Sequence, residues 1–139
     1  MKSFSERTEE GAGRRSIRFS VNFNQLLQRY LAAVVPPGLR VLEVGCENGD
    51  RLAALHPNRG VGIDTNPRWV ALAQDRHPNL EFRVAEPHDL AGLERFDYVL
   101  LTQVIQQVSD VQLLMEQLRG IVHSKSRLVV SVLNPLWRP

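Results

Sequence analysis

Five short apolar segments of strand length alternate with segments long enough for a helix, and this alternation limits the fold more than any other feature. The strand candidates occupy residues 39–44, 60–64, 80–85, 96–101 and 127–133. Between them the sequence predicts helical segments at 49–55, 67–76, 87–93 and 104–122. Strands that alternate with helices pair in parallel through right-handed crossovers. The pattern predicts an α/β fold, a three-layer sandwich around a mainly parallel sheet of about five strands.

The 139 residues suffice for one compact domain, preceded by a segment of different character. Residues 1–20 are polar, charged and aperiodic, so we expect a flexible leader there. From Asn22 the apolar residues follow helical spacing, and the "PPG" at 36–38 ends that helix because proline cannot continue it. We therefore expect residues 21–139 to form the folded domain.

Composition and charge exclude several classes of protein. A single cysteine, Cys46, excludes a disulfide framework. No apolar run approaches the ~20 residues of a membrane helix, and the N-terminus lacks an apolar signal core, so we expect a cytoplasmic chain without a membrane span. The net charge of +2 resides in the leader, which gives no reason to expect nucleic acid as a partner. The four histidines lack metal-ligand spacing, so we expect no metal.

The segment "VLEVGCENGD", residues 41–50, joins the first strand to a glycine turn. In open α/β sheets, ligands bind beyond the carboxyl ends of the strands, which makes this turn the default site. A pyrophosphate cradle needs G-x-G-x-x-G, whereas Gly45 and Gly49 are separated by three residues with Glu47 in the middle. Glu43 and Glu47 would repel a phosphate and attract a cation. The turn therefore favours a cationic ligand.

Together with "GVGID" and "FDYVLLTQVI", this segment resembles the class I S-adenosylmethionine (SAM)-dependent methyltransferases, of the small bacterial type that acts on metabolites or lipids. The resemblance covers residues 39–133 and keeps the order and spacing of the motifs. It implies a Rossmann-like sheet with strand order 3-2-1-4-5. It also implies SAM as cofactor, S-adenosylhomocysteine (SAH) as product and a small-molecule methyl acceptor.

The resemblance also assigns roles to residues that match the family's motifs. It places Glu43 near the methionine end of SAM and lets the Gly45 backbone approach the cofactor. Asp64 would accept the ribose hydroxyls, Glu86 the adenine amino group, and Thr102 would face the reacting methyl. The expected cofactor-binding set is Glu43, Gly45, Cys46, Gly49, Asp64, Thr65, Glu86 and Thr102. No residue identifies itself as a general base, so the catalytic residues stay open.

Three features depart from the family. Glu47 stands where members usually have glycine, and it is strained if the turn needs a positive φ. Pro87 has no N–H to offer adenine. The chain ends just past the fifth strand, without the family's last two strands. We therefore expect a truncated, catalytically silent chain that self-associates through the edge of the fifth strand.

Two other functions remain open at this point. One is a degenerate methyltransferase-like module that binds SAM weakly or not at all and serves as an interaction domain. The other is an NAD- or nucleotide-sugar-binding enzyme with Asp64 on a ribose, against which the two loop carboxylates argue. Simpler structural roles are also open, with Asp64 capping the next helix, Glu47 solvated and Cys46 a buried filler.

Overall fold

The computed structural model describes residues 22–134 and 136, so the expected leader at 1–20 lies outside the described residues. Residues 22–34 form a helix that stops before the proline pair, as the sequence predicts. This helix belongs to one compact unit, and the second unit begins at Val35. The sheet and all the expected site residues belong to the second unit.

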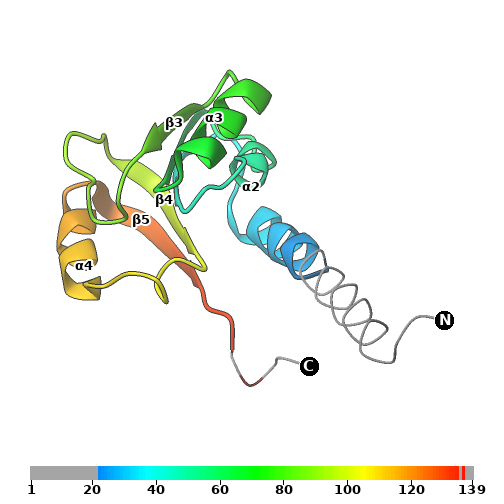
Figure 1. Ribbon diagram of the computed structural model, residues 1–139. Helices are drawn as coiled ribbons and strands as arrows, with labels where there is room; N and C mark the ends of the chain where they lie inside the picture. The colour runs from blue at the N-terminus through cyan, green and yellow to red at the C-terminus, as the bar shows by residue number, and fades with distance from the viewer. Residues whose placement is uncertain (1–21, 135, 137–139) are drawn as a thin grey trace. The chain divides into compact units, whose positions relative to one another are not determined.

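The second unit is built on a parallel five-stranded sheet in the order β3-β2-β1-β4-β5, which confirms the predicted fold class (Figure 1). Each pair of neighbouring strands is parallel. The central strands β1 and β4 are buried over most of their length, as expected for parallel strands that are covered on both faces. The strands are β1 (Arg40–Val44), β2 (Arg59–Asp64), β3 (Glu81–Val84), β4 (Phe96–Thr102) and β5 (Val122–Ser131).

Helices cover both faces of this sheet (Figure 1). On one face, α4 (Val111–Arg119) buries Leu114 and Leu118 in a cluster with alternate residues of β1, β2 and β4. On the other face, a Cβ placed on Gly60 would meet Leu52 of α2 (Asp50–Ala53). The α3 helix (Pro67–Arg76) accompanies β2 and β3. These helices and the sheet form the three predicted layers.

The α3 helix matches its predicted bounds because its start signal is strong. The Asn66 side chain accepts a hydrogen bond from the Arg68 N–H at 3.0 Å, and Pro67 occupies the first helical position. An N-cap side chain followed by proline satisfies the orphan donors of the first turn without losing a helical hydrogen bond.

Two predicted helices were wrong in extent. Residues 87–93 form turns, and the helix expected at 104–122 is α4 alone, from Val111 to Arg119. Gln103 leaves β4 with a left-handed φ of 59°, and residues 105–107 form a turn before α4 begins. The helix starts where the Asp110 side chain accepts a hydrogen bond from Leu113 N–H at 2.9 Å. β5 then begins at Val122, five residues earlier than predicted, with an irregular register beside Phe96 and Tyr98.

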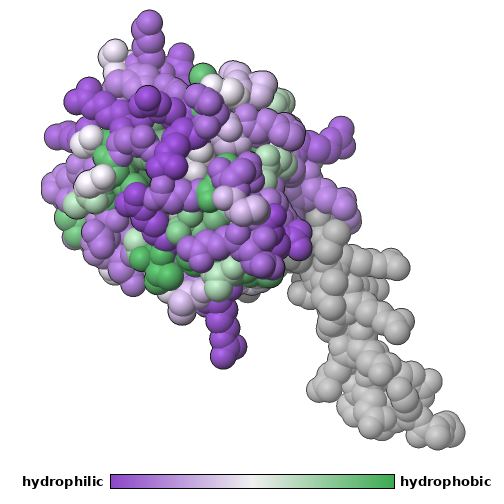
Figure 2. Space-filling model, turned by 90° about the horizontal axis from the view of Figure 1, so that it is seen from above, coloured by the Kyte–Doolittle hydropathy of each residue, from purple (hydrophilic) through white to green (hydrophobic). Residues whose placement is uncertain are grey.

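The face of the molecule that Figure 2 shows is mostly hydrophilic, with apolar side chains in small groups. Among residues 22–134 and 136, no helix is both long and apolar enough to cross a membrane. The cytoplasmic location stays a prediction.

β5 lies at one edge of the sheet, and half of its residues are exposed. It pairs only with β4 among the described strands, and Leu128, Val130 and Val132 are 45%, 41% and 56% exposed. We expect this apolar edge to pair with another copy, because exposed strand edges template such pairing. Val130→Lys should shift the chain towards monomer in sedimentation velocity.

Val84→Lys is the matched control, since Val84 is 54% exposed on β3 at the opposite edge. If Val84→Lys reduces self-association and Val130→Lys does not, the interface lies at the β3 edge. A chain that remains monomeric at high concentration would contradict the expectation altogether.

Candidate functional site

A cavity of about 280 Å³ opens at the carboxyl ends of the strands, where the sequence predicts the site. Its walls come from the ends of β1 and β2 and from the segments that follow β3 and β4. The residues that line it are Val44, Gly45, Ile63, Asp64, Thr65, Ala85, Glu86, Pro87, His88, Val104, Gln107, Val108 and Ser109. Four expected cofactor contacts, Gly45, Asp64, Thr65 and Glu86, are therefore brought together.

The other four expected contacts, Glu43, Cys46, Gly49 and Thr102, lie outside this lining. The loop after β4 was missed as a wall of the cavity, because the sequence pattern placed residues 104–109 in a helix. The region from Gln103 to Asp110 carries one usable signal, since Ser109-Asp110 is a good helix start. That signal shortens the helix and leaves a loop beside the site.

The two glycines of the first loop have left-handed backbones that serve different contacts. Gly45 has φ 79°, and a Cβ there would lie 2.4 Å from the Val104 side chain. Gly49 has φ 77°, and a Cβ there would lie 2.6 Å from the ring of Phe82 on β3. Gly45 thus brings the loop against the wall of the cavity, whereas packing against Phe82 is enough to explain Gly49.

Glu47 adopts φ 49°, which confirms that this position of the turn needs a positive φ. Its N–H donates to Asp64 Oδ2 at 3.0 Å, and its carboxylate pairs with Arg51 Nη1 at 3.3 Å. Strain of this kind costs about 1 kcal/mol or more for a residue other than glycine. The position is held from both sides by neighbouring polar groups.

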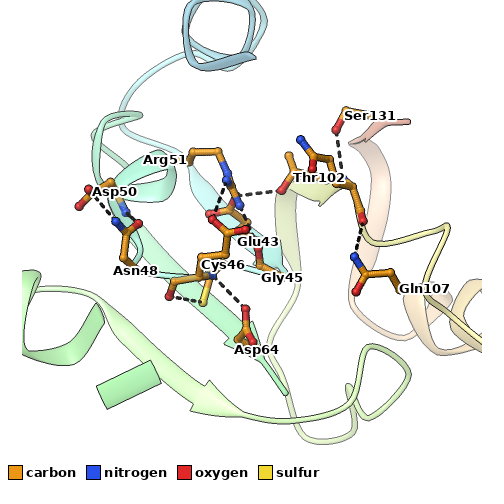
Figure 3. Close-up of polar contacts among 12 residues, drawn as sticks. Glu43, Gly45, Cys46, Asn48, Asp50, Arg51, Asp64, Thr102, Gln107 and Ser131 are labelled. Atoms are coloured by element: carbon orange, nitrogen blue, oxygen red, sulfur yellow. Dashed lines mark hydrogen bonds and ion pairs between the residues drawn. The ribbon is translucent and has the colours of Figure 1, made fainter. Parts of the chain in front are cut away.

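Glu43 is fully buried at the end of β1 and binds two partners through a single oxygen (Figure 3). Its Oε1 accepts hydrogen bonds from Arg51 Nε at 2.8 Å and from Thr102 Oγ1 at 3.0 Å. Its Oε2 is buried, and none of the residues that the structure describes forms a hydrogen bond with it. Burial raises the pKa of the Glu43 carboxyl, although the charge and hydrogen bonds of Arg51 and Thr102 act in the opposite direction.

Arg51 of α2 was not anticipated from the sequence, yet it donates hydrogen bonds to three groups around the turn. It reaches over the turn to Glu43 and Glu47, and its Nη2 donates to the Gly45 carbonyl at 3.0 Å (Figure 3). Burial alone would lower the pKa of Arg51, but the two carboxylates raise it. The i,i+4 spacing of Glu47 and Arg51 is the signal that could have indicated the pair. The two acids around the turn thus neutralise a residue of the same chain.

Asp64, at the end of β2, binds the backbone of two loops, the one after β1 and the one that follows β2. Its Oδ2 accepts from Glu47 N–H at 3.0 Å and its Oδ1 from Asn66 N–H at 2.9 Å. The α3 cap itself is the Asn66 side chain, not Asp64. Each carboxylate oxygen has a second lone pair, so both can still accept a hydrogen bond from a ligand. Thr65 is exposed beside it.

Two members of the expected set have side chains that are engaged elsewhere. The Thr102 hydroxyl is buried and donates to Glu43. The Cys46 side chain is 1% exposed, and burial, together with the charges of Glu43 and Asp64, raises the pKa of its thiol. A protonated, buried thiol agrees with the filler role. Cofactor contact by either residue stays a prediction.

Comparison with known proteins decides the family. A family model described as "Methyltransferase domain" matches residues 15–138, nearly the whole chain. The chain belongs to this methyltransferase-domain family. The matched range includes six residues that we assigned to the leader, so the domain boundary expected at residue 21 stays a prediction.

Relatives named as ubiquinone biosynthesis O-methyltransferases are about 30% identical to this methyltransferase domain over the aligned residues. The protein from Bradyrhizobium diazoefficiens is 30% identical over 111 residues, which cover 73% of this chain and 42% of the relative. The protein from Azorhizobium caulinodans is 32% identical over 105 residues, covering 70% and 41%. The chain thus spans about two-fifths of the length of these relatives.

Solved structures confirm the fold at lower identity. The N-methyltransferase NodS from Bradyrhizobium japonicum, in complex with SAH, has a TM-score of 0.63 and 21% identity, covering 80% of this chain and 60% of that one. The [4+2]-cyclase SpnF has a TM-score of 0.67 and 20% identity, covering 75% and 43%. A cyclase and a methyltransferase on one fold show that function must be argued from the site.

The strain at Glu47 gives a prediction about stability. Glu47→Gly should be more stable than Glu47→Ala by about 1 kcal/mol, because both lose the Arg51 pair and differ only by a Cβ in a left-handed backbone. Urea unfolding measures the difference.

The same two substitutions at Asn48, whose φ is not positive, should reverse the order. An alanine at position 47 that is as stable as glycine would show that the turn relaxes without strain.

Proposed function

We propose that this domain binds SAM with its adenosine part in the cavity and transfers the methyl group to a small-molecule acceptor. The observation that carries the proposal is the Asp64 carboxylate, which faces the cavity at the end of β2 with an unused lone pair on each oxygen. An acceptor-only group with two oxygens suits the two neighbouring hydroxyls of a ribose.

The rest of the cavity fits a nucleoside. The lining residues Ile63, Val104 and Val108 are apolar, which suits packing against a base. Glu86 also lines the cavity, and its carboxylate is an acceptor for the adenine amino group. Pro87 lies next to it and removes one backbone donor, so base recognition rests on fewer hydrogen bonds.

SAM supplies a methyl group that its sulfonium already activates, so the protein mainly has to align the acceptor with it. In this chain the left-handed Gly45 brings the loop against Val104, and Gln103 holds a strained backbone beside it. The similarity to O-methyltransferases of ubiquinone biosynthesis supports a hydroxyl group as the acceptor. No side chain of the cavity is assigned as a general base.

Replacing Asp64 tests the proposal. Asp64→Ala should weaken SAH binding at least tenfold in calorimetry, because a hydrogen bond to a charged group contributes about 1.5–3 kcal/mol. Asp64→Asn keeps one acceptor oxygen, so its affinity for SAH should lie between those of the wild type and Asp64→Ala. Thermal unfolding of both variants checks that the loop contacts to Glu47 and Asn66 are not the cause.

Asp75→Ala removes an exposed acid from α3 and should leave SAH affinity unchanged. NAD should bind neither the wild type nor the variants. Undiminished SAH affinity in Asp64→Ala would remove Asp64 from the site, and tighter binding of NAD than of SAH would favour the dinucleotide alternative.

A further inference from the structure

The cavity ends at Gly45, and the polar groups beyond Gly45 are already bound to one another. Glu43, Glu47 and Arg51 do not line the cavity, although all three contact or flank Gly45. The Arg51 guanidinium uses three donors, one on each acid and one on the Gly45 carbonyl. Its side chain is only 13% exposed. The acidic and carbonyl oxygens of the loop are thus already paired with a cation of the same chain, Arg51.

These acceptors are the ones that the ammonium of an amino-acid ligand would need. An ammonium has three donors and no acceptor, so it requires carboxylate or carbonyl oxygens. Three of the acceptors around Gly45, namely the Glu43 and Glu47 carboxylates and the Gly45 carbonyl, each accept a hydrogen bond from Arg51. Glu43 Oε2 has no hydrogen-bond partner among the described residues, and it is buried.

We propose that Arg51 is an internal cation that occupies the acceptors for the cofactor ammonium, so that the amino-acid end of SAM binds only after the guanidinium has moved. The inference rests on the proposed function, because it concerns the second half of the same ligand. An intramolecular competitor acts at an effective concentration on the order of millimolar or above. The adenosine half of the ligand binds without this competition.

Two ligands separate the two halves of the site. 5′-Methylthioadenosine shares the thioadenosine of SAH and lacks its ammonium and carboxylate. In wild type, SAH should bind no more than about tenfold tighter than 5′-methylthioadenosine, because the amino-acid end must displace Arg51. A larger ratio overturns the proposal, and this comparison needs no variant.

Arg51→Met removes the cation and keeps the length of the side chain. It should tighten SAH about tenfold or more and change 5′-methylthioadenosine by less than about threefold. Arg59→Met is the matched control, since Arg59 pairs with Glu81 and Glu94 at the opposite end of β2. It should change neither affinity. Weaker or unchanged SAH binding in a folded Arg51→Met overturns the proposal and would make Arg51 a support of the loop or of the ligand carboxylate.

Loss of a buried counter-charge can unfold the chain, so circular dichroism accompanies each titration. If Arg51→Met does not fold, the wild-type ratio of the two ligands decides. If neither ligand binds to wild type or to folded Arg51→Met, the proposed function fails together with this inference. If SAH and 5′-methylthioadenosine both bind, and SAH binds to wild type more than about tenfold tighter, only the inference about Arg51 fails.

Discussion

The arrangement at the ligand edge depends on the buried carboxylate of Glu43. A carboxylate removed from water costs several kcal/mol unless a counter-charge and hydrogen bonds compensate it. Arg51 from α2 supplies the charge, and Thr102 from β4 supplies a hydroxyl. One side chain at the end of β1 thus connects the first loop, the helix behind it and the neighbouring strand.

The Arg51 contact extends this constraint to the cavity. Arg51 also binds the Gly45 carbonyl and Glu47, and the Glu47 N–H binds Asp64 on β2. The chain of contacts places Gly45 and Asp64 on the same cavity. Two residues beside it, Glu47 and Gln103, keep left-handed backbones that only surrounding contacts can maintain. Such strain is common at functional sites. Here it occurs in the loop after β1 and in the segment after β4, which both contribute residues to the cavity wall.

The sequence predicted those parts of the fold that local patterns determine. The strands follow from short apolar runs, and α3 follows from Asn66 and Pro67. The segment after β4 could not be predicted in the same way, because its apolar residues continue the helical period of α4 although residues 105–107 form a turn. β5 began early because a pairing irregularity with β4 joins two strand segments.

The candidate site was predicted in part for a similar reason. Asp64 and Gly45 follow strands directly, so position along the sheet is enough to place them. Glu43 and Glu47 were interpreted as groups for a ligand, and the pairing with Arg51 depends on how the turn folds back on α2. The most direct test is a crystal structure of the chain saturated with SAH. The account predicts the ribose hydroxyls on Asp64 and an Arg51 side chain released from the Gly45 carbonyl. SAH bound away from Asp64, or bound there with the Arg51 contacts intact and its ammonium on Glu43, would contradict it.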